Sequence, residues 1–400
     1  MPRLIFANQL RGLAALCVVL THLVGVFWME RDLVSLATAS PAQVGSPPAA
    51  LLGLFTHRYL NFGPLGISVF FLISGLVIPI SLAQHSRISF TLARLLRIYP
   101  TYVAALLFQV GIVFAVARYW GNPFPHSISG FLANALLIQD FVGVPRIDPI
   151  SWTLNVELKF YLLMMLLAPL IRRGSVATLF ALAGVLLASN VLAPWTHLSG
   201  IAGVESMFLV FMLNGVLFNY RWRGLIGRAA FLVASAAMLT IFLACWWFSI
   251  LRWQFWVIPV NYFYGIAIFG TAYVFRNRFR PILLMDFLAD ISFPLYVIHF
   301  LGGLSLLKLL TLRFGLDYLV ALAITLSALL ALATLMHLTI ESRTIAMGRA
   351  LARSAWARPR VLSFLSPFHP IAGGLNLTAP GQAAPALRPG DARVKPGPDD

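Results

Sequence analysis

The sequence predicts an all-α integral membrane protein, a polytopic bundle of about ten transmembrane helices. Hydrophobic residues make up 60% of the 400 residues and charged residues only 10%, so hydrocarbon is the solvent for most of the chain. The mean hydropathy of +0.86 agrees. Apolar segments near the length of about 20 residues that a bilayer crossing needs recur along the chain. They lie near residues 8–28, 63–84, 97–117, 151–171, 175–194, 202–219, 230–250, 256–275, 284–307 and 317–340.

Basic residues predict the orientation of these segments. If the N-terminus is cytoplasmic, the inner connections hold most of the arginines, and the outer connections hold only scattered ones. The positive-inside rule then places both termini in the cytoplasm, which agrees with an even number of spans. The net charge of +16 follows from these connections and the tail, and nothing beyond basicity supports nucleic-acid binding. The inner arginines are Arg87, Arg94, Arg97, Arg172, Arg173, Arg221, Arg223, Arg228, Arg276, Arg278 and Arg280.

The N-terminal end of the chain is apolar, whereas the C-terminal end is rich in Pro, Gly and Ala. The first apolar segment is too long for a cleavable signal peptide, and no small-residue cleavage site follows it. From about Ser363 the chain is rich in Pro, Gly and Ala without a sustained apolar period, which is typical of disorder. We therefore expect a membrane domain over residues 1–345 and a cytoplasmic tail over 346–400, largely disordered from about residue 363.

Two ionisable residues lie within the first segment, NQLRGLAALCVVLTHL. Arg11 and His22 are eleven residues apart, which is about three helical turns, so they share a face roughly 16 Å apart along the axis. Ionisable groups at membrane depth cost roughly 2.5–3.5 kcal/mol on insertion scales, so each suggests a function. Simpler explanations stay open, because Arg11 suits an interfacial anchor and a buried histidine often bonds a backbone carbonyl.

The fourth and ninth segments carry polar residues at a similar depth. In SWTLNVELKFYLL, Glu157 lies about two turns below the outer surface, and Tyr161 lies one turn deeper on the same face. In DISFPLYVIHF, Tyr296 and His299 fall in the outer half. We therefore expect His22, Glu157 and His299 to converge. Lys159 points to a different helix face from Glu157, which disfavours a direct pair.

Positive charge at the cytoplasmic ends of the first and third segments suggests a phosphorylated ligand. Arg11, Arg94 and Arg97 cluster there, and guanidinium groups bind phosphate bidentately. A histidine beside a carboxylate suits proton abstraction from a hydroxyl. The same arginines also serve as topology signals, and Trp152, Tyr161 and Tyr296 also suit interfacial or packing roles. Cys17 and Cys245 are far apart, so no disulfide framework or metal-ligand pair is predicted.

Five motifs in order resemble the bacterial membrane-bound acyltransferase 3 family. The first is RGLAALCVVLTH, with Arg11 and His22. The second is FGPLGISVFFLISGLVI, which contains Ser74, and the third is RLLRIYPTY, with Arg94 and Arg97. The fourth motif is SWTLNVELKFYLL, in the fourth predicted segment. The fifth motif is SFPLYVIH, in the ninth predicted segment. Any one motif is weak, but five in order along nearly the whole membrane region are specific.

The resemblance implies a membrane O-acyltransferase of the bacterial inner membrane. It would move an acyl group, commonly acetyl, from acetyl-CoA or another acyl-CoA to a hydroxyl of an extracytoplasmic glycan, such as a surface polysaccharide or lipopolysaccharide. By residue match His22 would be the catalytic histidine, with Arg11 essential beside it and Glu157 as the acidic partner. Arg94 and Arg97 would assist the coenzyme phosphates. Ser74, Trp152, Tyr161, Tyr296 and His299 would support the substrates. No permanently bound cofactor or metal is implied.

Two questions stay open at this stage. His22 acts either as a base on the acceptor hydroxyl or as a transient acyl carrier. A transporter or flippase for a lipid-linked sugar or small metabolite is also compatible with many spans and intramembrane charges. Transport does not require a histidine and an arginine on one helix face, however. The sequence does not set the acceptor, the acyl chain or the oligomeric state.

Overall fold

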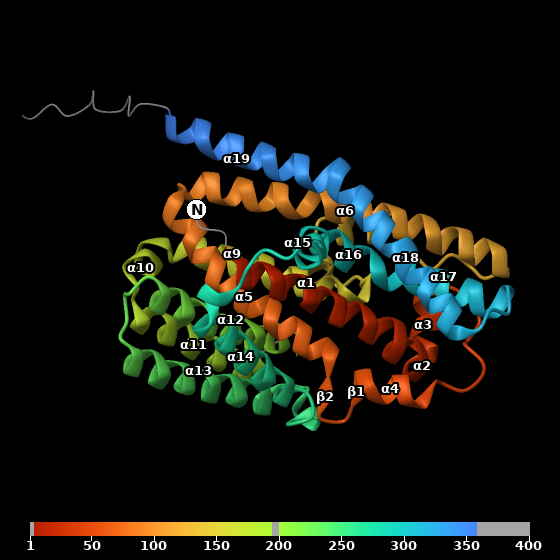
Figure 1. The fold of residues 1–400 in the computed structure, drawn as a ribbon, viewed down its shortest axis with the longest axis horizontal. Coiled ribbons are helices and arrows are strands. Elements are labelled where there is room, and N and C mark those ends of the chain that lie inside the picture. The colour runs from red at the N-terminus through yellow and green to blue at the C-terminus, as the bar shows by residue number, and fades with distance from the viewer. Residues whose placement is uncertain (1–3, 194–199, 358–400) are drawn as a thin grey trace, which may run out of the picture. The chain divides into compact units, whose positions relative to one another are not determined.

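The computed structural model describes residues 4–193 and 200–357 (Figure 1). In this part the regular structure is helical, apart from one antiparallel pair of two-residue strands, β1 (Thr56–His57) and β2 (Leu60–Asn61). The predicted all-α class is confirmed. The segment from about residue 363, which we expected to be disordered, lies outside the described residues.

The first half of the chain forms the elements that carry most of the polar residues. They are α1 (Ile5–Leu20), the π-helical turn η1 (Thr21–Val26), α2 (Phe27–Met29), α3 (Arg31–Thr38), α4 (Ala49–Phe55), α5 (Phe62–Gln84), α6 (Arg87–Trp120), α7 (Ile128–Ala135), α8 (Gln139–Val142), η2 (Pro149–Ser151), α9 (Trp152–Leu166), α10 (Ala168–Arg173) and α11 (Val176–Leu192).

The second half continues with helices, several of which are interrupted. They are α12 (Gly200–Trp222), α13 (Arg228–Phe248), η4 (Arg252–Gln254), α14 (Pro259–Val274), η5 (Arg276–Arg278), α15 (Leu283–Asp290), α16 (Ser292–Ile298), the π-helical turn η6 (His299–Gly303), α17 (Leu304–Lys308), η7 (Leu309–Arg313), α18 (Tyr318–Met336), η8 (His337–Glu341) and α19 (Ser342–Ala357).

All ten predicted segments coincide with helix. Among the described residues, six continuous helices are long and apolar enough to cross a membrane: Ile5–Met29, Phe62–Gln84, Arg87–Trp120, Arg228–Phe248, Ser292–Arg313 and Tyr318–Leu351. The other four segments correspond to α9 with α10, α11, α12 and α14, which are interrupted, shorter or only partly described. The protein is thus a multi-pass membrane protein.

The third helix is longer than the predicted segment 97–117. Ser86 caps its N-terminus by accepting a hydrogen bond from the backbone N–H of Ser89, so helix α6 begins ten residues earlier, at Arg87. Pro100 lies inside the helix without ending it. Arg94 and Arg97 therefore lie on a continuous helix, which holds their side chains in a defined direction. Helix α19 lies alongside this part of α6 (Figure 1).

Close helix packing places α5 at the centre of the bundle. It contacts α1, α12 and α14. A Cβ atom on Gly75 would lie 2.2 Å from the carbonyl oxygen of Met212 and 2.6 Å from the Cα of Gly215. A Cβ atom on Gly66 would lie 2.6 Å from the carbonyl oxygen of Ala14 in α1. Small residues at these crossings let backbones approach closely, as in other membrane helix interfaces.

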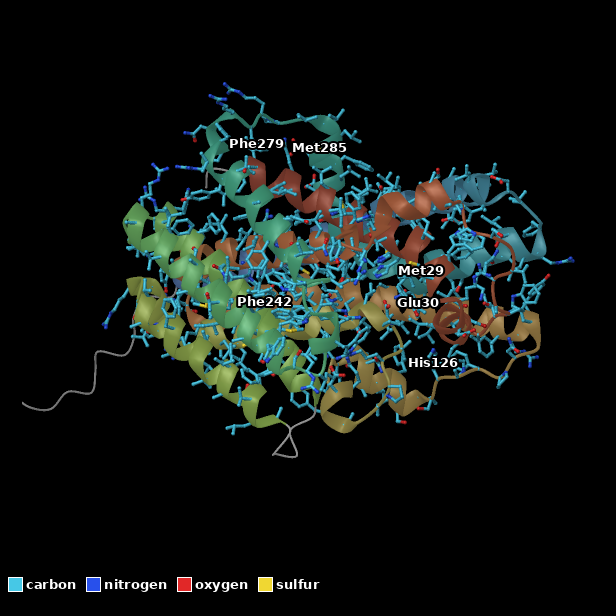
Figure 2. The ribbon with its side chains drawn as sticks, turned by 90° about the horizontal axis from the view of Figure 1, so that it is seen from below. Met29, Glu30, His126, Phe242, Phe279 and Met285 are labelled. Carbon is cyan, nitrogen blue, oxygen red and sulfur yellow. The ribbon has the colours of Figure 1, made fainter. Side chains whose placement is uncertain are left out.

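Side chains fill the space between these helices (Figure 2). Met29 and Glu30, at the end of the first span, are well separated in this view from Phe279 and Met285, which lie where the ninth segment begins. Helix α15 of that segment packs against the opposite part of α1, where a Cβ atom on Gly12 would lie 2.7 Å from the backbone nitrogen of Ala289. The two ends of the first span thus have different neighbours.

Candidate functional site

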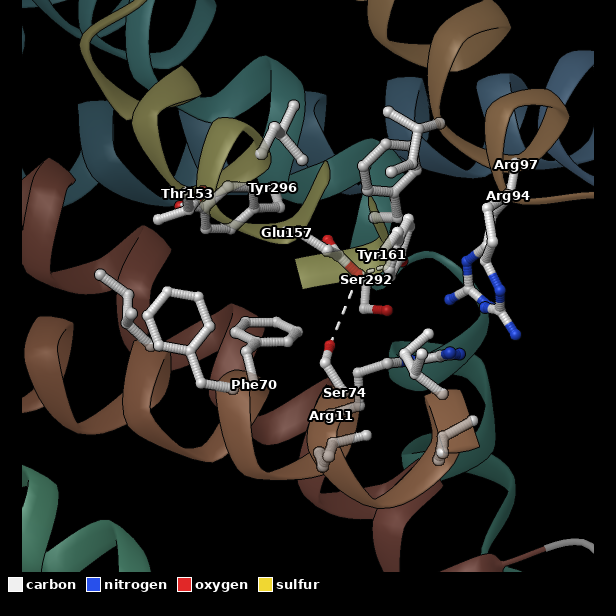
Figure 3. A pocket seen from close by; sticks show the side chains of 18 residues that line it. Arg11, Phe70, Ser74, Arg94, Arg97, Thr153, Glu157, Tyr161, Ser292 and Tyr296 are labelled. Carbon is white, nitrogen blue, oxygen red and sulfur yellow. Dashed lines mark hydrogen bonds between the residues drawn. The ribbon is translucent and has the colours of Figure 1, made fainter. Parts of the chain in front are cut away.

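A pocket with a cavity volume of about 130 Å³ lies between α1, α5, α6, α9 and α16. Figure 3 shows Arg94 and Arg97 at one end, Thr153, Tyr296 and Phe70 at the other, and Glu157 and Tyr161 between them. The lining residues are Arg11, Ile67, Phe70, Phe71, Ile73, Ser74, Val77, Ile78, Arg94, Arg97, Ile98, Thr153, Leu154, Glu157, Tyr161, Ser292, Phe293 and Tyr296.

Three arginines make one end of this pocket cationic. The Arg11 guanidinium donates to the backbone carbonyl of Ala289 at 2.7 Å, which ties α1 to the junction between α15 and α16. The Arg94 guanidinium lies 5.6 Å from the ring centres of both Phe90 and Tyr161. Its buried Nε has no hydrogen-bond partner among the described residues. Within the same residues neither Arg94 nor Arg97 forms an ion pair, so both can receive an anion.

Glu157 lies in the same pocket, where it accepts hydrogen bonds from the hydroxyl groups of Tyr161 and Ser74. The Ser74 contact is long, at 3.4 Å, and is drawn in Figure 3. Lys159 pairs with Glu205 on α12, which confirms that it does not pair with Glu157. The carboxylate therefore faces the arginine pocket and belongs to its polar lining.

The expectation that Glu157 lies beside His22 is wrong. His22 does not line the pocket, and its ring bonds a second imidazole, that of His299. The position of Glu157 along α9 follows from spacing, but spacing does not set which neighbouring helix its carboxylate meets. Asp148 and Ser151, just before α9, are each only 1% exposed, so α9 begins against other parts of the protein.

The predicted proximity of His22 and His299 is confirmed. Nδ1 of His22 lies 2.8 Å from Nε2 of His299, and the rings stack with centres 5.0 Å apart and planes at 18°. His299 is fully buried and His22 is partly buried. Each histidine begins or lies within a π-helical turn, His22 in η1 and His299 in η6. Such turns are rare and occur frequently at functional sites.

The contacts of His299 determine the tautomers of both neutral rings. Its Nδ1 lies 2.6 Å from the backbone carbonyl oxygen of Tyr296, which can only accept, so Nδ1 carries the proton and donates. Nε2 of the neutral His299 ring must then accept, and Nδ1 of His22 must donate to it. The lone pair of His22 consequently lies on Nε2. This is the arrangement a general base requires.

Tyr296 connects the histidine pair to the pocket. Its ring lies 5.6 Å from that of His299, while its side chain lines the pocket. Its hydroxyl and that of Thr153 are 2.8 Å apart. Trp152 does not line the pocket; it packs against Phe208, with ring centres 4.8 Å apart.

Sequence reasoning missed Thr153 and Ser292 as lining residues. Both lie inside the motifs SWTLNVELKFYLL and SFPLYVIH, beside the charged and aromatic residues that were predicted to form the site. Thr153 is four residues before Glu157, on the same helix face, and this spacing was a usable signal. Ser292 follows the break between α15 and α16, which the sequence pattern did not indicate.

Fold and site together define a multi-pass membrane protein with a cationic pocket beside a histidine pair. The family model for an acyltransferase domain matches residues 4–338, so the chain belongs to the acyltransferase 3 family. It is similar to an acyltransferase, MdmB, of Streptomyces mycarofaciens, with 30% identity over 158 residues, 38% of either chain. It is also similar to nodulation protein 10 of Rhizobium leguminosarum bv. viciae, with 31% identity over 160 residues, 34% of this chain and 41% of that relative.

These matches cover only part of the relatives. The chain spans about two fifths of the length of the curated relatives it matches. No solved structure matches the chain significantly.

Proposed function

We propose that this protein is a membrane O-acyltransferase. It moves an acyl group, acetyl in the first instance, from cytoplasmic acyl-CoA to a hydroxyl of an extracytoplasmic glycan such as a surface polysaccharide or lipopolysaccharide. Residues 1–345 form the catalytic membrane domain of a bacterial inner-membrane protein, and residues 346–400 form a tail on the cytoplasmic side, where both termini lie. The observation that carries the proposal is the His22–His299 contact, which leaves a basic nitrogen on a helix that also presents Arg11 to an anion-binding pocket.

The pocket supports the donor side of the proposal. Coenzyme A carries phosphate groups on a long thioester arm, and guanidinium groups are the side chains best suited to bind phosphate. Arg94 and Arg97 line the pocket without an ion pair among the described residues. We assign these two arginines to the phosphates and Arg11 to the interval between the phosphates and the reacting atoms. Glu157, Ser74 and Tyr161 then form the polar wall beside the arm.

The histidine pair supports the chemical step. Nε2 of His22 takes the proton of the acceptor hydroxyl as its oxygen attacks the thioester carbon, forming the new C–O bond. The C–S bond then breaks, and the thiolate of coenzyme A receives that proton from the His22 imidazolium. The carbonyl of Tyr296 and the ring of His299 hold the His22 ring in the productive tautomer throughout. No covalent acyl-enzyme is needed in this scheme.

The experiment that tests this function uses the full-length protein in liposomes. Radiolabelled acetyl-CoA is supplied on one side, and purified lipopolysaccharide or capsular polysaccharide on the other. We expect label on a glycan hydroxyl with the native protein, and none above background with His22→Ala or Arg11→Ala. Release of the label by mild alkali identifies an O-ester.

The same preparation separates transfer from transport. Unlabelled glycan that crosses the membrane without acetyl-CoA, and at an equal rate in both variants, identifies a transporter and overturns the proposal. Label that stays on the protein after denaturation identifies an acyl-enzyme, which replaces the direct-attack scheme given above.

A further inference from the structure

The ninth span is not a regular helix where it carries His299. The π-helical turn η6 (His299–Gly303) follows α16 directly and gives way to α17. In a regular α-helix the backbone N–H of Leu301 would donate to the carbonyl of Val297. Both groups bond to the side chain of Gln109, which reaches them from α6. Nε2 of Gln109 donates to the carbonyl of Val297 at 2.9 Å, and its Oε1 accepts from the N–H of Leu301 at 3.2 Å.

A third contact holds the Gln109 amide in place. Its Nε2 also donates to Oδ2 of Asp148 at 3.0 Å. Val297 and Asp148 offer acceptors, and Leu301 offers a donor, so only one orientation of the amide satisfies all three. Gln109 is fully buried and Asp148 is 1% exposed. Burying the polar amide of Gln109 costs free energy unless its nitrogen and oxygen are hydrogen-bonded. The three bonds therefore fix the position of this side chain.

Asp148 is held in turn by its own segment. Its Oδ1 accepts from the backbone N–H of Ile150 at 3.2 Å, in the connection that precedes α9. Burial raises the pKa of Asp148 to about 7, while the bonds from Gln109 and Ile150 act in the opposite direction. Both protonation forms of a carboxyl group keep an acceptor oxygen. The contact with Gln109 therefore persists on either side of neutral pH.

We propose that Gln109 is a positioning residue that holds the turn at His299 open and so directs His299 toward His22. A π-helical turn includes one more residue per hydrogen-bonded loop than an α-helix, and this changes the direction in which its residues point. Without Gln109 the Val297 carbonyl and the Leu301 N–H lose this link to α6, residue 299 rotates relative to α1, and the contact between the imidazoles is lost. This inference rests on the proposed role of His22 as a base, because positioning matters only for a group that reacts.

The test replaces Gln109 by methionine, which matches its length but can make none of the three bonds. Thr101→Val on the same helix is the matched control, because Thr101 is also fully buried and its hydroxyl has no partner among the described residues. We expect Gln109→Met to lower kcat for acetyl-CoA turnover with lipopolysaccharide roughly 10–100-fold, as for other residues that orient a reacting group. The KM for acetyl-CoA should stay unchanged, and Thr101→Val should match the native protein.

A double-mutant cycle distinguishes positioning from a general role in folding. In a His299→Phe background there is no imidazole to direct, so adding Gln109→Met should change kcat by less than about twofold. An equal loss of kcat in the native and His299→Phe backgrounds shows that Gln109 only supports the fold and overturns the proposal.

A chemical readout is independent of acyl transfer. Diethylpyrocarbonate modifies neutral imidazole, and mass spectrometry of the peptide that contains His22 follows its rate. Gln109→Met should lower this rate relative to Thr101→Val, because Nδ1 of His22 loses its acceptor and Nε2 becomes less nucleophilic. An unchanged or higher rate overturns the proposal. A lowered rate in a protein that transfers no acetyl group supports the positioning role and refutes the proposed function alone.

Discussion

The arginine pocket and the histidine pair are neighbouring regions built in opposite ways. The pocket is open, is lined from five helices, and contains two arginines without an ion pair among the described residues. At the histidine pair, His299 is fully buried, and both of its ring nitrogens have partners. Unpaired cations are suited to bind a mobile ligand, whereas a fixed tautomer is suited to move a proton. The difference indicates that binding and chemistry are separable by mutation.

The largest effect is expected at His22. His22→Ala removes the proposed base, and general-base catalysis contributes roughly 10²–10⁴-fold, so kcat should fall by that factor. Equilibrium binding of acetyl-CoA, measured by calorimetry on the detergent-solubilised protein, should stay within about twofold, since the pocket is intact. Loss of acetyl-CoA binding in parallel with kcat would show that the two regions are one site.

A smaller effect is expected at His299, and it depends on the substitute. The side-chain oxygen of His299→Gln can still accept from Nδ1 of His22, whereas His299→Phe keeps an aromatic ring but offers no acceptor. Initial-rate measurements should therefore show a loss of roughly 10–100-fold for the phenylalanine variant and a clearly smaller loss for the glutamine variant. Equal rates in both variants contradict the tautomer assignment.

At the pocket the effect should appear in KM. Arg94→Gln removes the proposed phosphate contact, which would serve the ground and transition states equally. KM for acetyl-CoA should therefore rise about tenfold, equivalent to about 1.4 kcal/mol, with kcat unchanged. Arg118→Gln is the matched control, because Arg118 lies on the same helix but is exposed. A fall in kcat alone for Arg94→Gln assigns this arginine to the chemical step instead.

The smallest effect on catalysis is expected at a helix crossing, that of α5 and α12. Gly75→Ala places a Cβ atom 2.2 Å from the carbonyl oxygen of Met212, and overpacking of this kind costs roughly 1–3 kcal/mol of stability. The variant should unfold at a lower Tm in detergent, with kcat and KM of the remaining folded protein near native. Gly184→Ala on α11 meets no atom within 4 Å and should not lower Tm. Matching Tm values for the two variants contradict the role of the α5–α12 crossing.

Several features of the site were predictable because they depend on local spacing. Arg11 and His22 lie on one span, Ile5–Met29, as their spacing predicted, but only Arg11 lines the pocket. The opposite directions of Glu157 and Lys159 follow from helical rotation, and the observed Lys159–Glu205 pair agrees. The neighbours of Glu157 were not predictable, because they depend on how α9 packs against α5 and α6.

Composition and periodicity by themselves determined the membrane class, the places of the helices and the polar residues that the spans retain. The ordered motifs determined the family. Only the tertiary structure decided that Glu157 joins the arginines, that His299 is the partner of His22, and that Gln109 stands between Val297 and Leu301. The physical reason is that apolar periodicity records which residues avoid water, whereas a hydrogen bond between two helices depends on their relative rotation and depth. Those quantities come from packing, through crossings such as that of Gly75 on Gly215.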